Sequence, residues 1–196
     1  MLRIGLPKGI LLGKSRQIMR NAAPEIYEDN LLSLKTNNMS LYLLKHRDIP
    51  VLIDHGYLDV GITSLEWLYE NSVMLEIYQY LDWNDTRISL IVSGQKENCI
   101  KGEFTCSSEY VKIATDYFIK KNMPIKKVVK ISGSTEATIP NMFDCCVDCV
   151  DTGSTLRKNN LIEKEVILFS KVVVIYKDKN ILKTKEFLKF EELLEC

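Results

Sequence analysis

The chain has 196 residues, of which 46% are hydrophobic, and its 26 basic side chains balance 26 acidic ones. A chain of this size and apolar content can bury one sizeable core or two small ones. Zero formal net charge excludes a broad positive field that would attract nucleic acid or an anionic membrane, so we expect neither as a partner. Any anion must be bound by local groups.

The first residues, MLRIGLPKG, lack the long apolar run of a signal peptide, and no stretch approaches the roughly 18 apolar residues of a membrane span. We therefore expect a cytoplasmic protein. The six cysteines are scattered along the chain, unlike the disulfide framework of a small secreted domain, and we expect reduced thiols.

The first third of the chain predicts alternating strands and helices. Apolar runs predict strands, and apolar residues at helical spacing predict helices. Pro50 suits the first turn of a helix and Gly56 suits its end. Residues 63–66 (TSLE) have the spacing of a capping box. The expected order is a strand at 2–6, a helix at 11–22, a helix from Pro50 to Gly56, a strand at 58–62, and a helix from 66.

The alternation continues to the end of the chain. Strands are predicted at 87–93, 127–131, 145–150, 165–169 and 171–177, and a helix at 109–121. The closing helix places on one face Phe187, Leu188, Phe190, Leu193 and Leu194. Strands and helices that alternate in this way indicate an α/β architecture with mainly parallel sheets.

The segment 144–160, DCCVDCVDTGSTLRKNN, allows two interpretations, and the first concerns its cysteines. Cys146 and Cys149 have the spacing of a redox dithiol or of half a zinc site. On a strand, however, residues three apart point to opposite faces, and the chain's two histidines, His46 and His55, are distant in sequence. We interpret these cysteines as small buried hydrophobic residues.

The second interpretation concerns the turn Asp151–Thr155. It follows a predicted strand and precedes a short helix, so it lies where open α/β sheets bind ligands. Gly153 allows the backbone to approach a ligand, and the hydroxyl groups of the turn lie beside free N–H groups of the helix start. The turn predicts a phosphate cradle. A capped helix start without a ligand is the alternative that the turn by itself leaves open.

The residues of this region also resemble the signature of a known family. The pattern D-x-x-D-T-G-x-T-L-R-x-N at 148–159, preceded by G-S-T-E at 133–136, is similar to that of the ATP phosphoribosyltransferases. Further matches follow the family's order along nearly the whole chain. They are LPKG at 6–9, DIP at 48–50, GxxDxGI at 56–62 and SEY at 108–110.

The resemblance implies transfer of the phosphoribosyl group of phosphoribosyl pyrophosphate to N1 of ATP, the first step of histidine biosynthesis. The length resembles the short form, which implies a regulatory subunit related to histidyl-tRNA synthetase and a homodimer within a hetero-oligomer. The implied fold is two Rossmann-like α/β domains of the type II periplasmic-binding-protein kind, with the chain crossing twice between them. Domain I would be 1–88 plus 173–196, the nucleotide side, and domain II would be 89–172, which carries the phosphoribosyl pyrophosphate turn.

The resemblance also assigns site residues. Asp148 and Asp151 would be catalytic, through the ribose hydroxyls or a water on Mg²⁺, the implied cofactor. Mg²⁺ would be bound to the pyrophosphate rather than in a protein cage. Lys8, Gly9 and Lys45 would contact ATP or pyrophosphate, although Lys45 also suits a solvated surface. Phosphoribosyl pyrophosphate would be bound by Glu136, Asp151, Thr152, Gly153, Ser154, Thr155 and Leu156.

Several positions depart from the family's usual pattern. Ile10 stands where the family usually has Arg, Ser64 and Glu66 where it has Gly and Asp, and Asn141 and Phe143 replace small residues. Ile10, Asn141 and Phe143 keep open the alternative of a non-catalytic two-domain module that binds a small anion or nucleotide. A subunit that is inactive without its partner is a third possibility. The segment 9–15 resembles a Walker A loop but is one residue short, so we reject that assignment.

Overall fold

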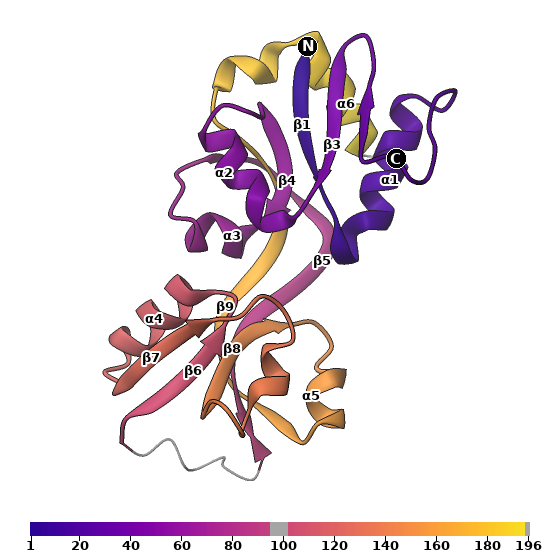
Figure 1. Ribbon diagram of the computed structural model, residues 1–196. Coiled ribbons are helices and arrows are strands. Elements are labelled where there is room, and N and C mark those ends of the chain that lie inside the picture. The colour runs from indigo at the N-terminus through magenta and orange to yellow at the C-terminus, as the bar shows by residue number, and fades with distance from the viewer. Residues whose placement is uncertain (95–101, 195–196) are drawn as a thin grey trace. The chain divides into compact units, whose positions relative to one another are not determined.

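The computed structural model describes residues 1–94 and 102–194, and these residues form an α/β fold of two compact units (Figure 1). Unit 1 is Met1–Asn84 with Lys171–Cys196, and unit 2 is Asp85–Ser170. The chain passes from one unit to the other in two long strands, β5 (Glu76–Ser93) and β9 (Leu161–Tyr176). The domain boundaries expected from the sequence fall within the same two strands.

Unit 1 contains a sheet with three parallel strands at its centre. The strand order is β2-β3-β1-β4-β9, in which β1 lies parallel to β3 and β4, whereas β2 and the last part of β9 are antiparallel to their neighbours. The strands that begin and end in unit 1 are β1 (Leu2–Pro7), β2 (Ser33–Lys35), β3 (Met39–Leu44) and β4 (Val60–Ser64). Its helices are α1 (Leu12–Ala22), α2 (Ile49–Asp54), α3 (Leu65–Glu70) and α6 (Lys185–Leu194).

Alternation along β1 explains how the helices of unit 1 cover both faces of this sheet. Ile4 and Leu6 point into the core that α1 and α6 complete, and Phe187 and Phe190 of α6 are buried there. Gly5 faces α2 instead, next to its register partner Gly61 on β4. A Cβ atom at either glycine would overlap Ile49 or Leu58, so the glycines allow α2 to pack closely on the sheet.

The sheet of unit 2 has the order β9-β5-β8-β6-β7, with β6 parallel to both of its neighbours. Its remaining elements are β6 (Phe104–Ser108), α4 (Val111–Lys120), β7 (Ile125–Lys130), a 3-10 turn (Thr135–Thr138), β8 (Cys145–Val150) and α5 (Ser154–Lys158). A cluster of apolar side chains around Cys146 and Leu156 forms the core beneath the end of β8. Phe143, one of the departures from the family pattern, packs against this cluster.

Three expectations about secondary structure are wrong. The strands expected at 165–169 and 171–177 are one continuous strand, β9, in which Ser170 is buried. The capping box at 63–66 does not form, because the hydroxyl group of Thr63 donates to the carbonyl of His46 and no side chain caps α3. Leu188 is 49% exposed, so it does not share the buried face of α6.

No helix within the described parts of the chain combines the length and hydropathy of a membrane span.

Candidate functional site

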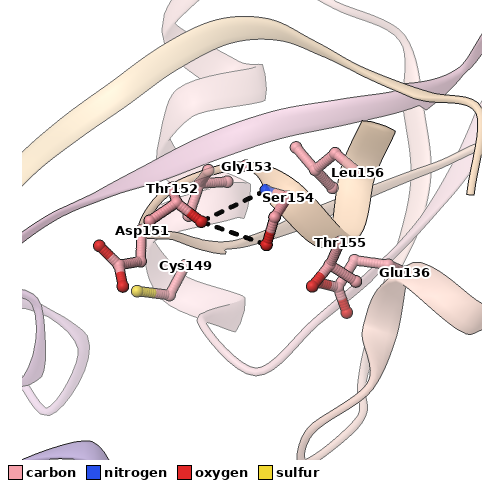
Figure 2. Close-up of a pocket in the computed structure, with 9 residues that line it drawn as sticks. Glu136, Cys149, Asp151, Thr152, Gly153, Ser154, Thr155 and Leu156 are labelled. Carbon is pink, nitrogen blue, oxygen red and sulfur yellow. Dashed lines mark hydrogen bonds between the residues drawn. The ribbon is translucent and has the colours of Figure 1, made fainter. Parts of the chain in front are cut away.

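A pocket of about 220 Å³ opens at the carboxyl end of β8, in unit 2 (Figure 2). It is lined by the turn that joins β8 to α5, by the last residues of β8, and by Glu136 from the 3-10 turn. The lining residues are Glu136, Cys149, Val150, Asp151, Thr152, Gly153, Ser154, Thr155 and Leu156. The structure thus brings together all seven residues that the resemblance assigned to phosphoribosyl pyrophosphate.

The backbone of the turn depends on Gly153 and Leu156. Gly153 immediately precedes α5 and has φ +69°, a left-handed conformation in which a side chain is strained. Leu156 is 4% exposed and packs against Val150 and Leu161. The glycine therefore lets the chain turn sharply, while the leucine holds the short helix against the core.

The turn carries hydroxyl and N–H groups that can donate hydrogen bonds. Thr152 Oγ1 donates to Ser154 Oγ at 3.2 Å, and the N–H group of Ser154 donates weakly to Thr152 Oγ1 at 3.4 Å (Figure 2). N–H groups in the first turn of a helix have no partner within that helix. Thr155 lies at this position and contributes a third hydroxyl group to the pocket. The turn offers several donors to a ligand with phosphate oxygens.

The two predicted catalytic aspartates occupy different environments. Asp151 is exposed and lines the pocket. Asp148 is half-buried beside the pocket, where its carboxylate accepts hydrogen bonds from the hydroxyl group of Thr135 and from the N–H group of Cys149. Burial, which outweighs these two hydrogen bonds, raises the pKa of Asp148 to about 6. Of the two aspartates, Asp151 is the one that lines the pocket.

The cysteines of β8 also differ in their environments. Cys146 is fully buried in the apolar core, whereas Cys149 lines the pocket. Burial and the nearby charge of Asp148 raise the pKa of the Cys146 thiol well above its usual range. Within residues 1–94 and 102–194, no three His, Cys, Asp or Glu side chains are grouped so that they could hold a metal ion.

The residues predicted to contact ATP or pyrophosphate lie in unit 1, at the carboxyl ends of its parallel strands. Lys8 and Gly9 follow β1, and Lys45 follows β3. Gly9 has φ +77°, so the chain turns sharply there. Lys8 is half-buried and Lys45 is exposed. Ile10, where the family usually has Arg, is 70% exposed at the same end.

His46 is a residue of this end of unit 1 that sequence reasoning missed. Its Nε2 lies 2.9 Å from the carbonyl oxygen of Lys8, and its Nδ1 lies 3.2 Å from Ser64 Oγ. A carbonyl can only accept, so Nε2 carries the proton and Nδ1 accepts from the hydroxyl group. Burial lowers the pKa of His46, which favours this neutral form. His46 thereby ties together the ends of β1, β3 and β4.

Two arginines that sequence reasoning gave no role donate hydrogen bonds to the backbone of the pocket turn. Arg87 Nη1 donates to the carbonyl oxygen of Asp151 at 2.8 Å, and Arg157 Nη1 donates to the carbonyl oxygen of Thr152 at 3.3 Å. Arg157 belongs to the sequence pattern at 148–159, and that pattern could have pointed to a role for Arg157 in the turn. Arg87 lies on β5, 64 residues from Asp151, and no local pattern could have revealed it.

Comparison with known proteins identifies relatives along most of the chain. The family model "HisG: ATP phosphoribosyltransferase" matches residues 45–195. The ATP phosphoribosyltransferase of Brachyspira hyodysenteriae is 34% identical over 178 residues, which are 85% of this chain and 84% of that protein. The enzyme of the same name from Thermococcus kodakarensis is 32% identical over 165 residues, 83% of this chain and 80% of that protein.

Solved structures share the fold. The ATP phosphoribosyl transferase (HisG:HisZ) complex from Thermotoga maritima contains a chain that matches with a TM-score of 0.86 at 23% identity, over 100% of this chain and 99% of that one. The arginine-bound form of truncated ArgBP from the same organism matches with a TM-score of 0.60 at 12% identity, over 99% of this chain and 94% of that one. This chain therefore shares its two-unit α/β fold with periplasmic-binding-protein-like structures.

The family model covers more than half of the chain, and relatives above 30% identity span most of it. Residues 149–156 of the sequence pattern, together with Glu136, line one pocket at the carboxyl end of β8. This chain belongs to the ATP phosphoribosyltransferase family.

Proposed function

We propose that this protein transfers the phosphoribosyl group of phosphoribosyl pyrophosphate to N1 of ATP, which is the first step of histidine biosynthesis. Family membership over residues 45–195 is the observation that carries the proposal. The pocket at the end of β8 supports it, because hydroxyl and N–H donors there suit a sugar phosphate.

In this reaction, N1 of ATP attacks C1 of the ribose while the bond from C1 to the pyrophosphate oxygen breaks. Phosphoribosyl-ATP and pyrophosphate are the products. The ribosyl centre is electron-poor in the transition state, so catalysis comes chiefly from positioning the two substrates and from neutralising the leaving pyrophosphate. A nucleophilic side chain is not required.

We assign the 5-phosphate to the donors of the turn Thr152–Leu156, and the ribose hydroxyls to Asp151 and Glu136. The carboxylates of Asp151 and Glu136 line the same pocket and can accept hydrogen bonds from a diol. Asp148 acts differently in this proposal. Through Thr135 it holds the 3-10 turn that presents Glu136, so it supports the substrate-binding carboxylate rather than contacting substrate.

Unit 1 is the nucleotide side in this proposal, and unit 2 is the phosphoribosyl side. Lys8 and Lys45 supply positive charge for a polyphosphate, and the turn at Gly9 allows backbone N–H groups to approach it. His46 orients this segment by its hydrogen bond to the Lys8 carbonyl.

A magnesium ion would fit this chemistry, because the pyrophosphate oxygens could serve as its ligands. Mg²⁺ prefers oxygen ligands and retains waters, and the exposed Asp151 carboxylate in the pocket can accept a hydrogen bond from such a water. When bound, the ion would neutralise negative charge on the leaving pyrophosphate.

We further propose that the protein works in the cytoplasm with a regulatory subunit related to histidyl-tRNA synthetase, as a homodimer within a hetero-oligomer. The structural relative from Thermotoga maritima is described as a HisG:HisZ complex, and its matching chain is covered almost completely by this one. Both facts support a catalytic chain that works with a partner.

An ultraviolet assay of the purified chain with ATP, phosphoribosyl pyrophosphate and Mg²⁺ tests the function, with and without a candidate regulatory subunit. We expect phosphoribosyl-ATP to form, faster when the subunit is present. Product only with the subunit would show that the chain is inactive alone. Tight substrate binding in calorimetry without product in either condition would contradict the transferase and support a binding module.

A further inference from the structure

Arg87 contacts the pocket turn and forms an ion pair with Glu163, and both residues lie outside the pocket lining. Its Nε and Nη2 donate to Glu163 Oε1 and Oε2 at 2.5 and 2.7 Å, and its Nη1 donates to the Asp151 carbonyl at 2.8 Å. Ser89 Oγ donates to Glu163 Oε1 at 2.7 Å. The side chains of Arg87 and Glu163 are only 27% and 23% exposed. One guanidinium group therefore contacts β9 and the turn from its place on β5.

The geometry of this contact fixes the direction of the guanidinium group. A bidentate pair with a carboxylate aligns the two planar groups, so the third nitrogen of Arg87 has little freedom to move. Because Glu163 also accepts from Ser89, its carboxylate is held from two sides. The hydrogen bond to Asp151 thus comes from a donor whose position is set before any ligand binds.

The direction of the Asp151 carbonyl matters for an anion in the pocket. In a trans peptide the C=O group of one residue and the N–H group of the next point in opposite directions. A carbonyl oxygen that turned toward a phosphate would repel it and would turn the N–H group of Thr152 away. Arg157 donates in the same way to the carbonyl of Thr152. Two consecutive carbonyl groups of the turn are therefore bonded to arginines.

We propose that Arg87, aligned by Glu163, is a positioning residue that keeps the Asp151–Thr152 peptide oriented for binding the phosphoribosyl group. The inference rests on the proposed function, and it adds to it two residues that lie outside the pocket lining. The competing explanation is a structural ion pair that only stabilises unit 2.

Two variants separate positioning from stability. Arg87→Lys keeps the positive charge but loses the planar fork, and Glu163→Gln keeps the shape of the side chain but loses its charge. Glu165→Gln is the matched control, because Glu165 lies on the same strand and accepts from Lys121 at 2.5 Å and from Tyr117 at 2.7 Å. It has no hydrogen bond to the pocket turn among the contacts of the described residues.

Each variant is assayed for its KM for both substrates, for its affinity for phosphoribosyl pyrophosphate by calorimetry, and for its melting temperature. We expect Arg87→Lys and Glu163→Gln to raise the KM for phosphoribosyl pyrophosphate about tenfold, the effect of a lost charge-assisted hydrogen bond, while the KM for ATP changes less than about twofold. Glu165→Gln should lower the melting temperature but leave both KM values near those of the wild type.

The wild-type chain in the same assay separates the two proposals. A wild type that makes no product, either alone or with the regulatory subunit, contradicts the proposed function. An active wild type whose folded Arg87→Lys variant binds phosphoribosyl pyrophosphate normally contradicts only the positioning role, as does an equal loss of affinity in Glu165→Gln. If neither variant folds, Ser89→Ala serves in their place, because it removes only the hydroxyl group that supports Glu163. It should raise the KM for phosphoribosyl pyrophosphate about threefold. An unchanged KM would overturn the inference.

Discussion

The hydroxyl group of Thr135 donates a hydrogen bond to the carboxylate of Asp148, and this contact joins the 3-10 turn that carries Glu136 to strand β8. Thr135 is fully buried, and Asp148 is half-buried. Burial makes ionisation of Asp148 costly, whereas the hydrogen bonds from Thr135 and from the Cys149 N–H group favour it. The net result is a pKa of about 6 for a carboxyl group beside the pocket.

This raised pKa predicts how stability depends on pH. An unfolded aspartate has a pKa of about 3.9, so between roughly pH 4 and pH 6 the folded chain binds more protons at Asp148 than the unfolded chain does. Stability due to this group therefore falls as pH rises through that window, by an amount on the order of 2 kcal/mol. Asp148→Asn should remove this part of the pH dependence, as measured by urea unfolding at pH 4.5 and pH 7.

Asp59 provides a control, because its effect on stability should change with pH in the opposite direction. Burial opposes its ionisation, but the hydrogen bonds and charge of Arg3 together lower the pKa of Asp59. Its contribution is present at neutral pH and is lost as pH falls, so Asp59→Asn should reduce stability more at pH 7 than at low pH. If Asp148→Asn left the pH dependence unchanged, the carboxyl group of Asp148 would not titrate in the expected window.

We predict that the pocket turn requires glycine at position 153, because the backbone there is left-handed. A Cβ atom there would meet Arg157 Nη1 at 3.7 Å and Val150 Cγ1 at 3.9 Å, which are ordinary contacts, so the cost of a side chain comes from φ +69°. Gly153→Val should lower stability by about 1–2 kcal/mol and weaken binding of phosphoribosyl pyrophosphate at least about tenfold. Gly153→Asn should be milder, because asparagine tolerates this conformation.

Calorimetry with phosphoribosyl pyrophosphate and thermal unfolding measure the two effects of the Gly153 variants separately. A folded Gly153→Val chain with wild-type affinity would mean that the turn does not need to keep this shape when it binds the substrate.

His46 is predicted to position the Lys8–Gly9 segment, which we propose contacts ATP. Removing its ring in His46→Ala frees the Lys8 carbonyl from the Nε2 donor, so the KM for ATP should rise about tenfold while the KM for phosphoribosyl pyrophosphate stays the same. His55→Ala is the matched control, because the exposed His55 ring bonds only to Val51 of its own helix among its described contacts. Steady-state kinetics at saturating phosphoribosyl pyrophosphate measure the KM for ATP of both variants. Equal KM values in His46→Ala and His55→Ala would refute the positioning role of His46.

How far the site could be predicted from the sequence depends on how far apart its residues lie along the chain. The turn Asp151–Leu156 was predictable because its residues are consecutive and follow a strand that the apolar pattern reveals. The contacts of Arg87 with Glu163 and Asp151 join residues 76 and 64 positions apart, and His46 contacts Lys8 across 38 positions. Such pairs leave no periodic signal in a single sequence.

Tertiary contacts also explain why one local pattern failed. Thr63 and Glu66 have the spacing of a capping box, but the Thr63 hydroxyl group bonds to the carbonyl of His46 and Glu66 is 4% exposed. Both side chains therefore face the protein rather than the helix end. The same region departs from the family pattern at Ser64, whose hydroxyl group meets the His46 ring.

Differential labelling of the cysteines is predicted to report on the pocket. Cys145 and Cys146 are fully buried, whereas Cys149 lines the pocket, so iodoacetamide should modify Cys149 at least about tenfold faster in the folded protein. Phosphoribosyl pyrophosphate should slow this reaction by covering the thiol. Mass spectra of fragments assign the modified residue, and unfolding in urea should equalise the three rates. Rapid labelling that the substrate did not slow would place the substrate elsewhere.

The last prediction concerns the packing of α2 on the sheet of unit 1. A Cβ atom at Gly61 would overlap Ile49 Cγ2 and lie 3.1 Å from Ile53 Cδ1, and both isoleucines are buried. Gly61→Ala should therefore displace α2 and lower the free energy of unfolding by about 1–3 kcal/mol. Gly13→Ala adds the same methyl group to α1 at a site that no atom beyond its chain neighbours and its own helix backbone approaches within 4 Å, so it should raise stability by about 0.5–1 kcal/mol. Urea unfolding of the two variants compares them directly, and a Gly61→Ala chain as stable as the wild type would mean that α2 does not need the flat surface of Gly5 and Gly61.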